Sequence, residues 1–228
     1  MKKLADGIAL LELTMKMGNY EMVIHPTLLW DDTDAVLVDT GFPGMLPAIR
    51  EEMELAGVPF SRLSKVVLTH QDYDHIGGLP AILEASEQPI QVLAHELDKP
   101  YIEGDKLLIK HDPARGVPPK AKVDSLISDG DVLPFAGGLK VIFTPGHTPG
   151  HVSLYHPGSQ TLITGDAIVS NDGKLLGPNE QFTPDMPLAW KSIGRFTDYD
   201  VKTAICYHGG ICDEQVNEQF ATLAKEHN

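Results

Sequence analysis

The chain has 228 residues, 42% of them hydrophobic, and its 32 acidic and 18 basic residues give a formal net charge of -14. Single domains commonly reach roughly 200–250 residues, so we expect one domain over residues 1–228. A surface this acidic repels nucleic-acid phosphates and anionic membranes, and no stretch approaches the roughly 20 apolar residues that span a bilayer. We therefore expect neither nucleic acid nor membrane as a partner, and we interpret the densest basic stretch, Lys106–Lys122, as a solvated loop.

The N-terminus and the cysteines indicate the compartment. Asp6 and Glu12 interrupt any apolar run near the start, so the sequence predicts no signal peptide. Cys206 and Cys212 are the chain's two cysteines, and their spacing fits neither a disulfide framework nor a zinc knuckle. We expect reduced thiols and a cytoplasmic protein.

Hydrophobic periodicity predicts strands with interspersed helices, which is an α/β arrangement. Apolar and β-branched runs predict strands at Ile8–Thr14, Met22–Trp30, Ala35–Asp39, Lys65–Thr69, Gln91–Ala94, Leu139–Thr144, Val152–His156, Thr161–Thr164 and Thr203–Tyr207. Apolar residues three and four positions apart predict helices at Met45–Ala56, Leu79–Ala85, Pro187–Phe196 and Asp213–Lys225. Lys99–Asp131 and Asn171–Asp185 are rich in Pro, Gly and charge, and we expect irregular excursions of the kind that form lids or binding loops.

Four side chains of metal-binding type follow one predicted strand within six positions. The strand Lys65–Thr69 leads directly into His70, Asp72, Asp74 and His75. A polar turn is the simpler interpretation of any one such residue. Two imidazoles and two carboxylates this close would desolvate or repel one another without a cation, so the segment predicts a metal site.

Three further short motifs each follow a predicted strand. They are TPGHTPGH at 144–151, TGD at 164–166 and YHGG at 207–210. Together with VDTG at 38–41 and HQDYDH at 70–75, they resemble the metallo-β-lactamase superfamily, whose pattern is H-x-H-x-D-H followed by a His, an Asp and a last His. The resemblance covers about residues 39–210. It implies a four-layer αβ/βα sandwich with the metal site at the strand ends.

The resemblance also assigns ligands to a first metal ion. It places His70 and His147 on this ion, with Asp72 at the position where the family usually has its second His. Asp166 corresponds to the family's aspartate that bridges both ions. The expected cofactor is therefore two divalent metal ions.

For the second ion, the resemblance implies Asp74, His75 and His208 as ligands. It also makes Asp74 the catalytic residue, which orients the bridging hydroxide and accepts its proton. His151 and Asp39 match family positions that support the ligands, and we do not expect either to bind metal.

Asp72 departs from the family pattern and bears on metal and substrate. A carboxylate is harder than imidazole, so we expect zinc with iron or manganese as alternatives. Two divalent ions against Asp72, Asp74, Asp166 and one hydroxide sum to zero, whereas a His at position 72 would leave one positive charge. This count predicts a preference for uncharged esters or lactones. Alternatively, Asp72 points away from the metals and solvates the loop.

These features predict a metal-dependent hydrolase in which a metal-bridged hydroxide attacks a small ester, lactone or thioester. One alternative is a di-iron oxidoreductase, because the related flavodiiron proteins carry H-x-E-x-D-H. Another is a phosphodiester or phosphotriester hydrolase, and a third is a non-catalytic scaffold, which the nearly complete ligand set disfavours. The apolar stripe Met186, Leu188, Trp190, Ile193 and Phe196 is compatible with a homodimer, although core packing is the default interpretation.

Overall fold

The computed structural model describes residues 1–18 and 20–226, and its strands gather within these residues into two large sheets. The first sheet has the order β1 (Lys2–Ala5), β2 (Ile8–Leu10), β5 (Thr27–Trp30), β6 (Ala35–Val38), β7 (Leu63–Val67), β8 (Gln91–His95), β9 (Ser125–Ile127). The second has the order β10 (Val132–Leu133), β11 (Leu139–Phe143), β12 (Val152–His156), β13 (Thr161–Gly165), β16 (Thr203–Cys206), β17 (Gly210–Cys212).

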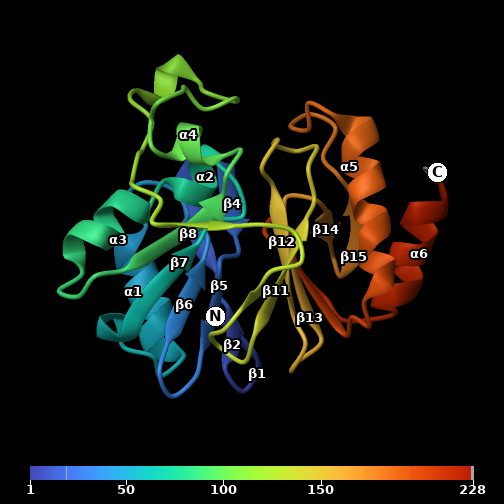
Figure 1. The fold of residues 1–228 in the computed structure, drawn as a ribbon, viewed down its shortest axis with the longest axis horizontal. Helices are drawn as coiled ribbons and strands as arrows, with labels where there is room; N and C mark the ends of the chain where they lie inside the picture. The colour runs from blue at the N-terminus through green and yellow to red at the C-terminus, as the bar shows by residue number, and fades with distance from the viewer. Residues whose placement is uncertain (19, 227–228) are drawn as a thin grey trace.

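Helices cover the outer face of each sheet (Figure 1). On one side lie α1 (Leu46–Leu55) and α3 (Leu79–Ala85), and on the other lie α5 (Met186–Ile193) and α6 (Val216–Glu226). Ile49 and Ile82 pack against the first sheet, whereas Ile193 and Phe220 pack against the second. The layers therefore follow the expected αβ/βα order.

Alternation along the strands explains why the sheets pack face to face. Val36 and Val38 of β6 point into the layer between the sheets, where they join Val141 of β11. Ala35 and Leu37 point the other way, beneath α1 and α3. A strand with apolar side chains on both faces is buried on both sides, and all four β6 residues are buried.

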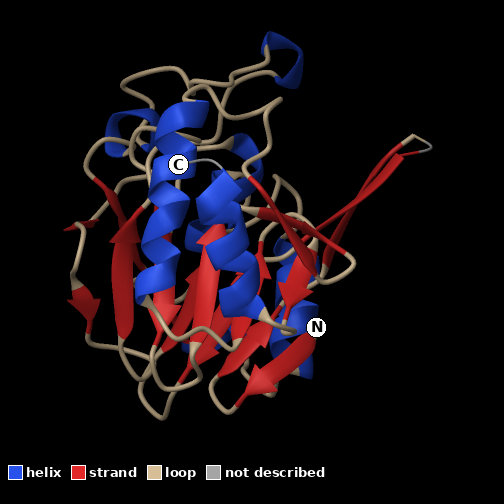
Figure 2. Cartoon of the chain, turned by 90° about the vertical axis from the view of Figure 1, so that its right-hand side faces the viewer, coloured by secondary structure: helices blue, strands red, loops and turns tan. Residues whose placement is uncertain are grey.

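The predictions of one continuous strand at Ile8–Thr14 and another at Met22–Trp30 were wrong, because each segment contains residues of two strands. Residues 8–14 divide into β2 and β3 (Leu13–Met17), and residues 22–30 divide into β4 (Tyr20–Ile24) and β5. The breaks lie opposite each other, where the Leu11 amide donates to the Pro26 carbonyl at 2.9 Å. Proline has no amide proton for a ladder, so the chain leaves the first sheet here. The β3–β4 ribbon then extends from the body of the molecule (Figure 2).

The excursions contain more regular structure than their composition predicts. Residues 99–131 include α4 (Lys99–Ile102), a 3-10 turn at Pro113–Arg115 and β9, while residues 171–185 include β15 (Lys174–Gly177), which pairs with β14 (Val169–Asn171). The last helix begins at Val216 instead of Asp213. Asp185 caps α5 through a 3.0 Å hydrogen bond from the Leu188 amide, with Pro187 in the first turn as predicted.

Strand direction places the candidate ligands at one edge. Strands β6, β7 and β8 are parallel neighbours, and β13 runs parallel to β16. The carboxyl end of β7 lies close to the second sheet, because the Val152 amide at the start of β12 donates to Thr69 at 2.9 Å. The segments after β7, β11, β13 and β16 therefore meet.

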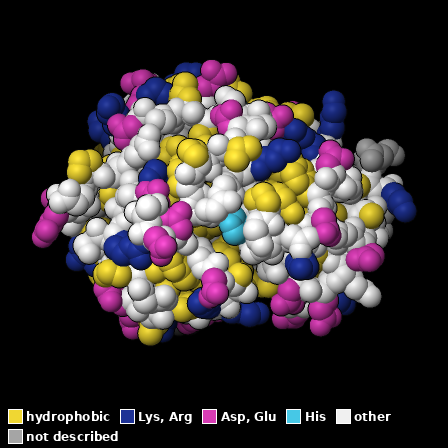
Figure 3. Space-filling model, turned by 60° about the horizontal axis from the view of Figure 1, so that its bottom comes forward, with side chains coloured by type: hydrophobic (Ala, Val, Ile, Leu, Met, Phe, Trp, Pro, Cys, Tyr) yellow, Lys and Arg dark blue, Asp and Glu magenta, His cyan; other side chains and the backbone are white. Residues whose placement is uncertain are grey.

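The outer surface agrees with the composition. Figure 3 shows acidic and basic side chains interspersed on one face, with hydrophobic side chains between them. Among residues 1–18 and 20–226, no helix has the length and apolar character needed to cross a membrane.

Candidate metal centre

The segment after β7 forms a tight turn, called here the His70 turn (residues 70–75). The chain leaves β7 at Val67 and enters the short helix α2 (Tyr73–Ile76), with Asp72 at the position before its first residue. Gly78 lies two residues after this helix, and a Cβ added there would lie 2.2 Å from the Thr40 carbonyl oxygen. Only glycine allows this close approach of backbone to backbone.

The structure brings His70, Asp72 and His147 into one group. The Asp72 Oδ2 atom lies 3.3 Å from His70 Nε2 and 2.9 Å from His147 Nε2. All three residues are buried, and their candidate ligand atoms lie within 4.8 Å of one another. Asp72 therefore points into the site and not toward solvent.

A second group contains Asp74, His75 and His208. The Asp74 Oδ2 atom lies 3.1 Å from His208 Nε2 and 3.8 Å from His75 Nε2. Asp74 and His208 are partly exposed, with 19% and 28% of their side chains accessible. This half of the site is thus the more open one.

Asp166 contacts both groups. Its Oδ2 atom lies 3.4 Å from His147 Nε2 and also 3.4 Å from His208 Nε2, while its Oδ1 atom lies 3.3 Å from His75 Nε2. One carboxylate thus faces a histidine of each group. This is the placement expected of a ligand shared between two ions.

The donor atoms suit a metal ion better than they suit one another. His70 Nε2, His75 Nε2, Asp72 Oδ1 and Asp166 Oδ1 are buried and have no hydrogen-bond partner among the described residues. Buried polar atoms are normally satisfied, and unpaired ones cost free energy. Imidazole nitrogens and carboxylate oxygens converging in this way fit divalent zinc, iron or manganese.

The sequence profile described as the metallo-beta-lactamase superfamily matches residues 20–208, which is most of the chain. The chain belongs to the metallo-beta-lactamase superfamily. The resemblance inferred from the motifs is therefore confirmed at the level of the superfamily.

Relatives in this superfamily include proteins described as metallo-hydrolases. Probable metallo-hydrolase YflN of Bacillus subtilis (strain 168) is 29% identical over 223 residues, covering 86% of this chain and 82% of the relative. Probable metallo-hydrolase YybB of the same strain is 31% identical over 193 residues, covering 82% and 80%. A hydroxyacylglutathione hydrolase of Synechococcus sp. (strain JA-2-3B'a(2-13)) is 29% identical over 174 residues, covering 75% and 58%.

Solved structures share the fold. A metallo-beta-lactamase family protein from Thermus thermophilus has a TM-score of 0.77 at 22% identity, covering 99% of this chain and 80% of the other. A Cronobacter sakazakii metallo-beta-lactamase with a HARLDQ motif has a TM-score of 0.72 at 20% identity, covering 98% and 90%. The predicted four-layer αβ/βα sandwich is confirmed.

The pKa values of the buried histidines and carboxylates in this site show the influence of burial and of neighbouring charges. Burial lowers the pKa of His70 to about 4, which keeps its imidazole neutral and able to bind a metal. Burial also disfavours protonated His208, but Asp166 outweighs it and raises the pKa of His208 to about 10. Likewise, the pKa of Asp166 lies well below its usual range, because His208 and His75 overcome the effect of burial. The Asp166 carboxylate is therefore ionised and attracts cations.

Buried partners hold the ligands in place. Asp39 Oδ2 lies 2.9 Å from His75 Nδ1, and the Asp39 carboxylate also accepts hydrogen bonds from the Thr69 amide and hydroxyl. His151 Nε2 accepts from the Asp166 amide at 3.0 Å. Asp39 and His151 thus contact candidate ligands, and the resemblance gives both positions a supporting role. Such contacts fix a ligand's orientation.

Tyr207 also supports the site. Its hydroxyl donates to the Asp74 carbonyl at 2.5 Å, and its ring lies 3.8 Å from that of His75. The Tyr207 hydroxyl is therefore already engaged in a hydrogen bond within the protein.

Sequence reasoning missed two charged residues beside the site. Lys110 lies in the stretch predicted as solvated loop, yet its Nζ atom is 2.5 Å from Asp72 Oδ2 and 2.7 Å from His147 Nε2. Asp98 is completely buried next to the His70 turn, and burial raises its pKa to about 6. Neither residue belongs to a motif or a periodic segment, so the sequence offered no means of finding them.

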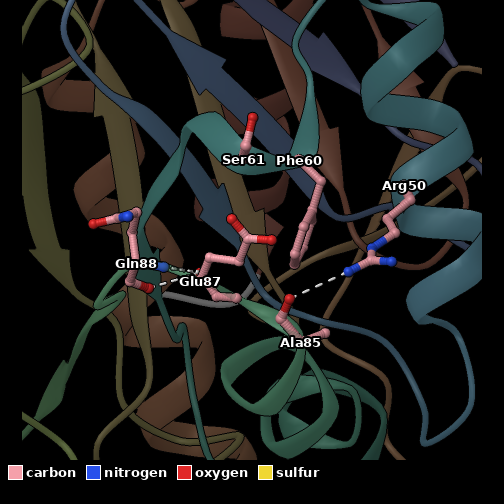
Figure 4. A pocket seen from close by; sticks show the side chains of 7 residues that line it. Arg50, Phe60, Ser61, Ala85, Glu87 and Gln88 are labelled. Carbon is pink, nitrogen blue, oxygen red and sulfur yellow. Dashed lines mark hydrogen bonds between the residues drawn. The ribbon is translucent and has the colours of Figure 1, made fainter.

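A separate pocket of about 250 Å³ lies between α1, the 3-10 turn Phe60–Arg62 and the end of α3 (Figure 4). Arg50 occupies one wall, with its guanidinium 4.3 Å from the Phe60 ring centroid and a hydrogen bond to the Ala85 carbonyl. This pocket is lined by residues distinct from the ligand groups, so we do not assign it to the metal centre.

Proposed function

We propose that this superfamily member is a hydrolase that uses two divalent metal ions, with zinc the expected metal, on a small ester, lactone or thioester. The observation that supports it most is the Asp166 carboxylate, which lies within 3.4 Å of histidines from both ligand groups. His70, Asp72 and His147 would hold one ion, Asp74, His75 and His208 the other, and Asp166 both.

When bound, divalent ions of this kind lower the pKa of water and polarise a carbonyl oxygen. The chain itself provides the base. Before metal binds, the positive charge of His75 and the hydrogen bond of His208 outweigh the burial of Asp74 and lower the pKa of its carboxyl group. A bound divalent ion would take the place of that positive charge and keep the carboxylate ionised. The Asp74 side chain remains 19% exposed, so solvent can reach it. Asp74 is thus suited to orient the attacking water and to accept its proton.

The protein also fixes this base. The Asp74 backbone carbonyl receives the Tyr207 hydroxyl, and Tyr207 is itself buried beneath the site. The short helix α2 holds Asp74 and His75 next to each other. The carboxylate is therefore held before substrate arrives, which reduces the entropy lost on reaching the transition state.

The substrate class is supported by the relatives. A relative described as a hydroxyacylglutathione hydrolase cleaves a thioester by name, and the described metallo-hydrolases share most of this chain's length. Thioester, ester and lactone carbonyls all require the same attack by activated water. We propose this class over phosphodiesters and over oxidation by iron.

Elemental analysis and a substrate panel test the proposal. We expect about two zinc ions per chain and hydrolysis of 4-nitrophenyl acetate, a γ-lactone or a hydroxyacylglutathione. Dialysis against a chelator should abolish turnover, and added zinc should restore it. Turnover that survives metal removal would contradict the proposal, as would activity confined to bis(4-nitrophenyl) phosphate or consumption of oxygen by an iron-loaded protein.

A further inference from the structure

The Lys110 ammonium is built into the first ligand group. It lies 2.5 Å from Asp72 Oδ2 and also donates to the carbonyl oxygens of His147 at 3.2 Å and Phe182 at 3.0 Å. The Lys110 side chain is 22% exposed and that of Asp72 is 10% exposed. An ion pair this far from bulk water is screened weakly, so its charge is felt within the site.

The two oxygens of Asp72 have different surroundings. Oδ2 contacts the Lys110 ammonium, whereas Oδ1 is buried and has no hydrogen-bond partner in the described part of the chain. Oδ2 also faces His70 Nε2 at 3.3 Å and His147 Nε2 at 2.9 Å, so the pairing with Lys110 lies next to both candidate ligand nitrogens. Oδ1 is the oxygen of this carboxylate that a metal ion would find without a partner among the described residues. The ammonium also lies 2.7 Å from His147 Nε2, a candidate ligand atom that a bound ion would take over. Its three N–H donors would then remain with Asp72 Oδ2 and the carbonyls of His147 and Phe182.

Lys110 changes the charge expected from the ligands alone. Two divalent ions, three ligand carboxylates and one hydroxide sum to a net charge of zero. The total would be one positive charge if a neutral histidine stood at position 72. Lys110 cancels the negative charge of Asp72 and returns the total to one positive charge. Arg115 of the same loop lies near the His70 turn, with its guanidinium 5.4 Å from the ring centroid of Tyr73.

We propose that Lys110 is a specificity-determining residue: its pairing with Asp72 restores positive charge to the site and favours esters that carry an anionic group over neutral ones. The inference rests on the proposed ester-type hydrolase function. It reverses the preference for uncharged substrates that the ligand count predicted, because that count omitted Lys110.

A matched pair of esters tests the role of Lys110. The probes are neutral 4-nitrophenyl acetate and anionic mono-4-nitrophenyl succinate. We expect Lys110→Met and Lys110→Gln to lower the ratio of kcat/KM for the anionic over the neutral ester about tenfold, the effect of one unit charge at short range. Lys110→Arg should largely preserve the ratio. Lys106→Met is the control, because Lys106 lies on the same loop over the Tyr101 ring.

Two binding measurements separate the charge role from a structural one. Succinate should bind the zinc-loaded protein more weakly after Lys110→Met, as measured by calorimetry, even if no ester is turned over. Zinc should bind the metal-free variant more tightly, because a repelling cation has been removed. Weaker zinc binding would mean that Lys110 only holds Asp72 in place, and would overturn the proposal.

The outcomes distinguish this inference from the proposed function. If the wild-type protein hydrolyses neither ester nor any lactone or thioester, the proposed function fails, and succinate and zinc binding still decide the role of Lys110. If both esters are hydrolysed and Lys110→Met leaves their ratio unchanged, only the role of Lys110 is refuted.

Discussion

The buried carboxylate of Asp98 accepts the hydroxyl hydrogen bond of Thr148 at 2.7 Å. The same carboxylate accepts the amides of Gln71 at 3.0 Å and Gly150 at 2.9 Å. Gln71 follows His70, and Thr148 follows His147. Asp98, which directly precedes α4, therefore links the loop of His70 to the loop of His147, and these two loops form the first ligand group.

Replacing Asp98 with Ala should weaken both the fold and metal binding. Two buried amides would lose their acceptor, and each unsatisfied donor costs about 1–3 kcal/mol. We expect a loss of about 2–4 kcal/mol in the free energy of unfolding, measured with urea. We also expect zinc affinity of the first group to fall about 10–100-fold, the usual cost of removing a group that orients ligands.

Asp105→Ala is the matched control for this variant, because Asp105 is exposed on the segment after α4. It should change neither the unfolding free energy nor zinc binding measurably. An Asp98→Ala protein with unchanged zinc affinity would show that the two loops keep their positions without this carboxylate.

Asp166→Asn should affect both metal ions together. The amide retains the size of the side chain but removes the charge that faces His147 and His208. We expect zinc content to fall below two per chain and kcat/KM to fall about 10³-fold or more, equivalent to roughly 4 kcal/mol of transition-state stabilisation.

Asp172→Asn is the control variant for Asp166→Asn, because it makes the same substitution outside the two ligand groups. Asp172 is exposed in the turn between β14 and β15, and its positive φ of 48° is one that asparagine also accepts. Both zinc content and activity should match the wild type. Selective loss of one metal in Asp166→Asn would indicate that this residue serves a single ion.

The sequence motifs and the family resemblance identified residues that the structure brings together, although their role as metal ligands stays a prediction. His70, Asp166 and His208 each follow a buried apolar strand, and strands β7, β13 and β16 are short, continuous and readily recognised. β13 and β16 are parallel neighbours in the second sheet, whereas β7 belongs to the first sheet. The strands could be predicted locally, but the meeting of their ends across two sheets was implied only by the family resemblance.

The sequence was insufficient where a residue's role depends on a distant partner. Residues 8–14 form an uninterrupted β pattern, and Pro26 is the one local sign of a break in residues 22–30. Neither segment shows by itself that the chain changes sheet at Leu11 and at Pro26. Lys110 and Asp98 lie in segments without periodicity, and each meets a ligand loop 37 to 50 residues away in the chain. Their contacts are decided by tertiary packing.

Asp72 offers a direct test of the departure from the usual histidine. Its Oδ2 atom lies 2.9 Å from His147 Nε2, so we expect Asp72→Ala to lower the zinc affinity of the first group at least about tenfold. Asp72→His should keep zinc bound, since imidazole is also a zinc ligand. Equilibrium dialysis measures both. Unchanged zinc affinity in Asp72→Ala would show that Asp72, although it points into the site, is not a metal ligand.

Asp31 links the two halves of the fold at the opposite end of the strands from the His70 turn. One carboxylate oxygen accepts the amides of Thr33 at 2.7 Å and Asp34 at 2.8 Å, and the other accepts the Ala136 amide at 2.9 Å. The hydrogen bond from the Asp34 amide is the main reason that the pKa of Asp31 falls from its ordinary value of 3.8 to about 2.

The stabilisation from Asp31 should therefore depend on acid pH. Because its pKa is lower in the folded state, the contribution is present above about pH 4 and is lost as the pH falls toward about 2. We expect Asp31→Ala to reduce the free energy of unfolding by about 1–2 kcal/mol near pH 7, as for loss of a capping side chain. The difference from wild type should shrink between pH 4 and pH 2, whereas the variant of its exposed neighbour, Asp32→Ala, should show little difference at any pH. A wild-type advantage over Asp31→Ala that stays constant down to pH 2 would mean that the ionised carboxylate does not stabilise this turn.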